Sequence, residues 1–111
     1  MDGSYDPQLL KGVLSLVLLH VLAERESYGY EVVQRLHDLG LTDLAAGTVY
    51  PALSRLERET WLASRLVPSE EGPARKYYGL NRSGADLLER SKKTWHDFAG
   101  AMDRLLEGEE E

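Results

Sequence analysis

The chain has 111 residues, of which 42% are hydrophobic, and it contains no cysteine. This length supports one modest core, and the lack of cysteine excludes disulfides, thiolate metal sites and thiol nucleophiles and favours a reducing, cytoplasmic location. The formal net charge of −6 argues at first against nucleic acid, because DNA affinity comes largely from Lys and Arg near phosphates.

The charge is unevenly distributed along the chain. Residues 1–40 carry three basic and six acidic side chains, residues 41–82 carry six and five, and residues 83–111 carry four and eight. The middle third is therefore the part of the chain where DNA would be tolerated. The acidic end, Glu107 with Glu109, Glu110 and Glu111, is interpreted as a solvated tail.

Asp6 and Pro7 predict the start of a first helix, because an N-cap acceptor precedes a residue that tolerates the first helical position. An apolar run from Leu9 to Leu22 follows directly. The run is too short for a membrane span and contains Lys11. Because this helix has almost no polar stripe, one small domain can hardly cover it, and a second subunit is expected.

Two shorter helices are predicted next. Ser27 can cap a helix that runs to about Leu39 and stops at Gly40, with an apolar side formed by Tyr30, Val32, Val33 and Leu36. The following helix carries apolar residues at spacings of three and four, namely Val49, Ala52, Leu53 and Leu56. Pro51 fits its first turn if Thr48 is the N-cap, since the backbone N–H that proline lacks is not needed there.

A change to a period of two predicts a β-hairpin from segments 61–67 and 75–80, with turn formers at 69–73 between them. Asn81 then caps a last helix with a coiled-coil seam of Leu88, Ser91, Trp95, Phe98, Met102 and Leu105. The predicted fold is mainly α with a small β-hairpin. It consists of a winged helix-turn-helix domain over residues 1–81, and a C-terminal dimerisation helix with an acidic tail over residues 82–111.

Three motifs carry a resemblance to a known family. They are Tyr-Gly-Tyr-Glu at 28–31, Gly-Thr-Val-Tyr-Pro-Ala-Leu-Ser-Arg-Leu-Glu at 47–57 and Gly-Pro-Ala-Arg-Lys-Tyr-Tyr-Gly-Leu at 72–80. In this order and spacing they resemble the PadR family of transcriptional regulators. The resemblance implies a homodimeric winged-helix repressor of the short branch with a single C-terminal helix, which includes multidrug-sensing members. In those members a tryptophan midway along the last helix lines a pore at the dimer centre, and Trp95 occupies the similar position.

The chain departs from the family pattern at two positions. Thr60 stands where the family usually has glycine, and glycine there suits a left-handed helix end that a β-branched residue enters at a cost of about 1 kcal/mol or more. The turn after the third helix is therefore expected to differ. Asn81 stands where the family often has threonine, and both residues cap helices well.

A helix-turn-helix protein places the first residues of its recognition helix in the major groove, so Thr48, Tyr50 and Ser54 are candidates to contact base edges or phosphates. Arg55 is expected to bind the DNA backbone, whereas Arg58 is interpreted as an exposed surface charge. Thr48 has the alternative of acting only as a helix cap.

Tyr28 begins the second helix, where its hydroxyl and the helix amides could hold a phosphate; alternatively it packs the turn, the interpretation favoured for Tyr30. The base of the wing offers phosphate or minor-groove contacts through Arg75, Lys76 and Tyr77. Carboxylates at the tip, Glu70 and Glu71, would repel phosphates.

The expected partners are a second copy of the chain and an inverted-repeat operator in double-stranded DNA, with half-sites roughly 34 Å apart. A small aromatic or drug-like effector is a further candidate partner, and it would contact Trp95, Phe98, Ala99 and Met102. The alternative is that these four residues only pack in the dimer interface. No cofactor, metal site or catalytic residue is predicted, because His20, His37 and His96 fall in separate helices. The alternative function is a winged-helix protein-interaction module without DNA binding, as the acidic ends of the chain would allow.

Overall fold

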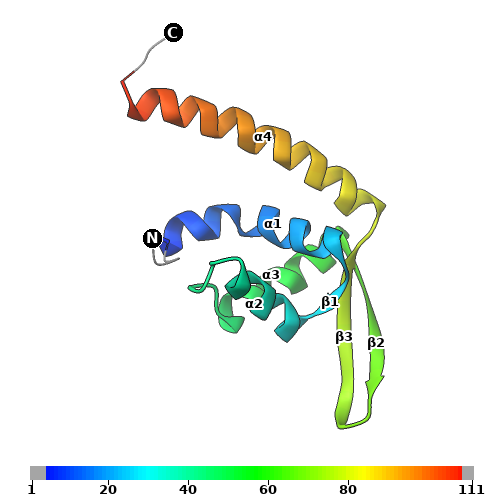
Figure 1. The fold of residues 1–111 in the computed structure, drawn as a ribbon. Coiled ribbons are helices and arrows are strands. Elements are labelled where there is room, and N and C mark those ends of the chain that lie inside the picture. The colour runs from blue at the N-terminus through cyan, green and yellow to red at the C-terminus, as the bar shows by residue number, and fades with distance from the viewer. Residues whose placement is uncertain (1–4, 109–111) are drawn as a thin grey trace.

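The structure, a computed structural model, describes residues 5–108. Its elements are α1 (Pro7–Glu24), β1 (Ser27–Tyr28), α2 (Gly29–Asp38), α3 (Ala46–Arg58), β2 (Leu62–Ser69), β3 (Gly72–Leu80) and α4 (Arg82–Leu106). Figure 1 shows α1, α2 and α3 gathered together, the β2–β3 hairpin projecting to one side, and α4 running back along α1. The predicted mainly helical winged fold is confirmed, while the predicted acidic tail at Glu109, Glu110 and Glu111 lies outside the described residues.

Two of the four predicted helix caps are confirmed. The side chain of Asp6 accepts from the Gln8 amide (2.7 Å), and that of Asn81 accepts from the Gly84 amide (2.8 Å). The prediction for Ser27 is wrong, because this residue lies in β1 and is fully buried, and Tyr28 holds the N-cap position of α2 without a side-chain bond.

The prediction that Thr48 caps α3 is also wrong. The helix begins at Ala46, and the carbonyl of Ala45 accepts from the amides of Thr48 and Val49 (both 3.0 Å). Pro51 therefore lies inside the helix and not in its first turn. The missing N–H leaves the carbonyl of Gly47 without a helical partner, and because Gly47 is exposed, solvent can satisfy it.

The core lies between α1, α2, α3 and the start of the wing. Its fully buried members include Leu18, Leu19, Leu36, Leu53 and Leu56. The predicted apolar sides of α2 and α3 are buried as expected, with one exception: Tyr30 is 55% exposed. Tyr30 precedes Val33 by three residues but occupies the first turn of α2, beyond the edge of the core.

The hairpin is longer than predicted and is joined by a third strand. The antiparallel sheet has the order β1-β3-β2, with Tyr28 opposite Tyr77 and Arg65 opposite the same Tyr77. The strands continue to Ser69 and Gly72, so the tip contains only Glu70 and Glu71. A strand of two residues such as β1 has too little pattern to be recognised in the sequence.

The end of α3, the start of β2 and the start of α4 meet at one junction. Thr60 has a φ of +69°, and the amide of Trp61 donates to the carbonyl of Leu56 (3.0 Å), which closes the helix in a Schellman turn. Asn81 Nδ2 donates to the carbonyl of Thr60 (2.6 Å). A Cβ at Gly84 would lie 2.1 Å from the carbonyl oxygen of Trp61, so glycine is required for α4 to start this close to the turn. The expectation that this turn would differ from a glycine-type turn is wrong, because Thr60 itself adopts the left-handed conformation.

The seam of α4 divides into two parts. Leu88 is 5% exposed and belongs to the core of its own chain, so its prediction as part of an interface with a partner is corrected. Farther along, α4 leaves Trp95, Phe98 and Leu105 exposed. Among residues 5–108, no helix combines the length and apolar character needed to cross a membrane.

Substituting Thr60→Gly is expected to stabilise the protein by about 1 kcal/mol, because glycine enters the left-handed region without the steric cost that a Cβ brings. The midpoint of thermal unfolding should rise by a few degrees. Thr60→Ala is the matched control: it removes the hydroxyl but keeps the Cβ, and should give no comparable gain. Equal stabilisation by both substitutions would contradict the role of the backbone angle.

Candidate nucleic-acid interface

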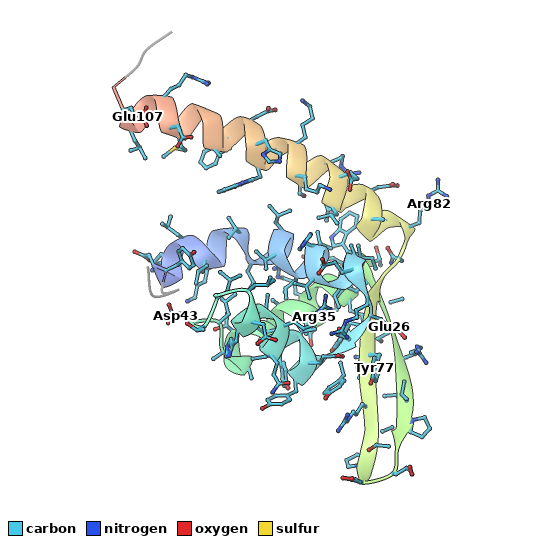
Figure 2. All side chains as sticks on the ribbon, in the orientation of Figure 1. Glu26, Arg35, Asp43, Tyr77, Arg82 and Glu107 are labelled. Carbon is cyan, nitrogen blue, oxygen red and sulfur yellow. The ribbon has the colours of Figure 1, made fainter. Side chains whose placement is uncertain are left out.

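A surface hollow of about 590 Å³ lies where the start of α2, the exposed face of α3 and the wing strand β3 meet. It is lined by Tyr28, Gly29, Tyr30, Tyr50, Ser54, Arg75, Lys76 and Tyr78. The lining thus contains four tyrosines, two cations and no carboxylate. Figure 2 shows polar side chains along the hairpin and around the adjoining ends of the helices.

The ring of Tyr50 lies against the start of α2. A Cβ built on Gly29 would be 2.9 Å from Cε1 of that ring, so glycine at position 29 lets the Tyr50 ring lie directly against the start of α2. Tyr50 is nevertheless 44% exposed, and Ser54 follows it one turn later on the same side of α3. These two side chains form the α3 wall of the hollow.

A partly buried hydrogen-bond network supports the turn that carries Tyr28. Arg35 of α2 donates from Nη1 to the hydroxyl of Ser27 (2.9 Å) and to the carbonyl of Arg25 (3.3 Å), and from Nη2 to Glu24 (3.1 Å). The Arg35 side chain is 14% exposed. Figure 2 shows Arg35 beside the base of the wing, near Glu26. This network joins the end of α1 to α2 and fixes β1 between them.

Lys76 is held toward α3 by a carboxylate. Its Nζ lies 2.8 Å from Glu57 Oε1, and Ser64 donates a short hydrogen bond to the other oxygen of Glu57. The pKa of Glu57 is lowered mainly by the hydrogen bond from Lys76 and further by that from Ser64. The hydrogen bond to Glu57 in turn raises the pKa of Lys76. Lys76 therefore keeps its positive charge, but the adjacent Glu57 carboxylate offsets part of the positive potential at this surface.

The opposite face of the wing carries a second ion pair and a row of rings. Arg65 donates from Nε to Glu26 (3.1 Å), and this contact lowers the pKa of Glu26. The same guanidinium lies 5.8 Å from the ring centroid of Tyr77, which Figure 2 places in the hairpin. Tyr77 in turn makes an edge contact with Tyr28, with ring centroids 5.4 Å apart.

The structure brings together five of the eight side chains predicted to contact DNA, namely Tyr28, Tyr50, Ser54, Arg75 and Lys76. Tyr77 shares a strand with Arg75 and Lys76 but does not line the hollow.

Thr48 and Arg55 do not line the hollow either. Arg55 donates to the Ser15 hydroxyl of α1 (3.0 Å) and lies 3.4 Å from Glu59, so its guanidinium has partners within the chain. Three further residues line the hollow that were not predicted from the sequence: Gly29, Tyr30 and Tyr78. The adjacent motif at 28–31 was the available signal for the first two.

A second, apolar groove of about 570 Å³ separates the first half of α1 from the second half of α4. Its lining includes Leu9, Val13, Trp95, Phe98 and Met102. Of the predicted effector and interface residues, Leu88, Ala99 and Leu105 do not line it. Within the part of the chain that the structure describes, no cluster of three His, Cys, Asp or Glu side chains could hold a metal ion.

Comparison with known proteins identifies the family. The model of the transcriptional regulator PadR-like family matches residues 18–90. The chain belongs to this family. A PadR-like transcriptional regulator from Bacillus cereus has 37% sequence identity and a TM-score of 0.79, with 92% of this chain and 99% of that one covered. A PadR family regulator from Eggerthella lenta has 34% identity and a TM-score of 0.83, with coverages of 90% and 87%.

Two longer relatives share only part of their length with this chain. Bacillus subtilis PadR in complex with operator DNA has 28% identity and a TM-score of 0.64, covering 70% of this chain and 45% of that one. The transcriptional regulator YqjI of Escherichia coli is 31% identical over 84 residues, which are 74% of this chain and 39% of YqjI. Membership of the PadR-like family makes the protein a transcriptional regulator and not an enzyme.

Replacing Glu57→Gln should destabilise this PadR-like protein at neutral pH by less than about 1 kcal/mol, because the pair with Lys76 is partly exposed. The pKa of Glu57 is lowered from 4.5 by folding, so its contribution is present above that value and is lost as the pH falls through the lower folded-state pKa. Urea midpoints of variant and wild type should therefore converge at low pH.

Glu70→Gln at the wing tip is the matched control, because no ion pair with a described residue involves Glu70. It should leave the midpoint unchanged at both pH values. A Glu57→Gln effect of the same size in acid and at neutral pH would show that the ion pair does not cause it.

Proposed function

We propose that the protein is a homodimeric repressor that binds an inverted-repeat operator through the hollow described above and releases it when a small aromatic molecule binds near Trp95. The observation that carries the DNA part is the hollow itself, because it joins the α3 face, the start of α2 and the wing cations on one surface. Access to DNA requires the cytoplasmic location that the cysteine-free composition favours.

The chemistry of the hollow suits a DNA backbone. Arg75 and Lys76 supply positive charge, Tyr50 and Ser54 supply hydroxyl donors on α3, and the first amides of α2 lie at its edge. The complex of Bacillus subtilis PadR with operator DNA supports transferring this role to the present chain. The acidic remainder of the surface would limit binding to unrelated DNA.

The apolar groove between α1 and α4 supports a dimer. Leu9 is 73% exposed, Phe98 56% and Leu106 77%, and isolated soluble domains rarely leave so continuous an apolar surface in water. A second copy related by a two-fold axis would cover this surface with the same surface of its own. In this proposal residues 1–81 bind DNA, and residues 82–111 provide the dimerisation helix and tail.

The same groove supports effector binding. Trp95 and Phe98 both line it, and a two-fold partner would bring a second Trp95 toward the first. Two facing indole rings could hold a flat aromatic molecule between them. Such a ligand would bind where the two chains meet.

Sedimentation should give twice the mass of a single chain at micromolar concentration. Phe98→Glu places a charge in the apolar groove and should shift the equilibrium toward monomer. Lys93→Gln changes the net charge by the same amount on the exposed side of α4 and should leave the dimer intact. A monomeric wild-type protein would disprove the dimer.

Selection from a random duplex library should return inverted repeats with half-sites roughly one helical turn apart. The affinity for the selected duplex should fall steeply with salt, and Arg75→Ala should reduce the slope by about 0.9 for each phosphate contact that is lost. Arg82→Ala is the matched control, since Arg82 lies at the start of α4 (Figure 2) and does not line the hollow. No duplex binding at low salt would favour the protein-interaction module instead.

Planar cationic drugs should quench tryptophan fluorescence and weaken DNA binding. The quenching should be lost in Trp95→Ala, because the groove contains that ring and not Trp61. Trp61→Phe is the control and should retain the quenching that depends on the groove. Undiminished quenching in Trp95→Ala would place the ligand elsewhere in the protein.

A further inference from the structure

Tyr28 and Arg75 form a stacked pair at the edge of the hollow. The Cζ atom of Arg75 lies 4.5 Å from the centroid of the Tyr28 ring. The two residues come from neighbouring strands, β1 and β3, which pair through Tyr28 and Tyr77. The guanidinium of a surface arginine is thus held by an aromatic face.

Of the three cations of the wing, two are paired with carboxylates and the third lies over an aromatic ring. Arg65 pairs with Glu26, and Lys76 pairs with Glu57. No ion pair with a described residue involves Arg75. A cation paired with a carboxylate must give up or share that partner to bind a phosphate, whereas a cation over a ring keeps its charge and its N–H groups. Arg75 is therefore the wing cation best prepared to meet an anion.

The Tyr28 ring is itself fixed. Tyr77 contacts it edge to face, with centroids 5.4 Å apart and planes at 64°, and the β1–β3 pairing holds the two residues opposite each other. Immediately before Tyr28, Ser27 is buried and bound by Arg35. A ring fixed by the sheet and by this network can keep a long, flexible arginine side chain in one orientation.

We propose that Tyr28 is a positioning residue for DNA binding: its ring holds the Arg75 guanidinium in place for a phosphate, and its hydroxyl is not the phosphate ligand. The proposal rests on the DNA-binding function proposed above. Binding DNA normally costs an arginine its rotamer freedom, and a side chain that is already stacked loses less on binding. The aromatic face contributes this ordering without neutralising the charge.

The stacked pair can be tested without DNA, by NMR of the free protein. Ring currents from Tyr28 should shift the Arg75 side-chain δ protons upfield of their usual position in the wild type and in Tyr28→Phe. The shift should disappear in Tyr28→Leu, which keeps an apolar side chain but has no ring. Unshifted Arg75 protons in the wild type would overturn the proposal, whether or not the leucine variant folds.

The consequence for binding can be tested with a double-mutant cycle, measured by fluorescence anisotropy on the duplex recovered by selection. Tyr28→Phe should bind within about twofold of the wild type. Tyr28→Leu should bind about two- to fivefold more weakly for each wing that touches DNA, the range expected for an exposed cation–aromatic contact. In an Arg75→Ala background, Tyr28→Leu should have almost no further effect, because the guanidinium it would orient is absent.

Two results would overturn the positioning role. One is a clear loss of affinity in Tyr28→Phe, which would make the hydroxyl a ligand. The other is full additivity of Tyr28→Leu and Arg75→Ala, which would make the residues independent. If the wild type binds no duplex, the proposed function fails and the positioning role with it, while the NMR measurement still decides whether the stack exists.

Discussion

The close approach of α4 to the turn at the end of α3 is the contact on which the rest of the arrangement depends. Gly84 allows the approach, because any larger residue would place its Cβ within van der Waals radii of the Trp61 carbonyl oxygen. Asn81 bonds to both sides of the contact, accepting from the Gly84 amide and donating to the Thr60 carbonyl. This single junction therefore fixes the end of α3, the first residue of the wing and the direction of α4. The direction of α4 in turn places Trp95 and Phe98 opposite the first half of α1, where they line the apolar groove.

The junction contains Thr60, the one residue other than glycine with a positive φ among residues 5–108. Thr60 adopts a left-handed conformation that glycine would adopt more easily, yet the Schellman turn closes normally, with the Trp61 amide bonded to the Leu56 carbonyl. The neighbouring contacts at Asn81 explain why the cost is tolerated: they satisfy the exposed Thr60 carbonyl and tie it to a second helix. A local penalty of about 1 kcal/mol is small beside the burial of the core that the turn makes possible.

Much of the fold follows from patterns within the sequence, and two of the errors, at Ser27 and Leu88, arise where a residue outside the local pattern decides. The order of the helices and the hairpin, and the caps at Asp6 and Asn81, depend on neighbours in the chain, and these predictions are confirmed. Ser27 looks like a helix cap locally, but Arg35, eight residues later, donates a hydrogen bond to its hydroxyl in a partly buried network. Leu88 fits a seam for a partner, yet its own chain covers it. A periodic apolar stripe shows which side of a helix is covered, and cannot show by which molecule.

For the candidate interface, the sequence predicted which residue types could meet DNA, but the arrangement of their partners decides which remain available. Arg55 was expected to bind the DNA backbone, and the structure engages its guanidinium with Ser15 and Glu59 instead. Lys76 lies in the hollow with a carboxylate beside it, and Arg75 lies there with a ring beside it. In a chain with a net charge of −6, the number of basic residues says little about affinity for an anion. Affinity depends instead on which cations are ordered by the fold and have no carboxylate partner. At this surface a tyrosine beside the cation meets both conditions, whereas a glutamate beside it meets only the first.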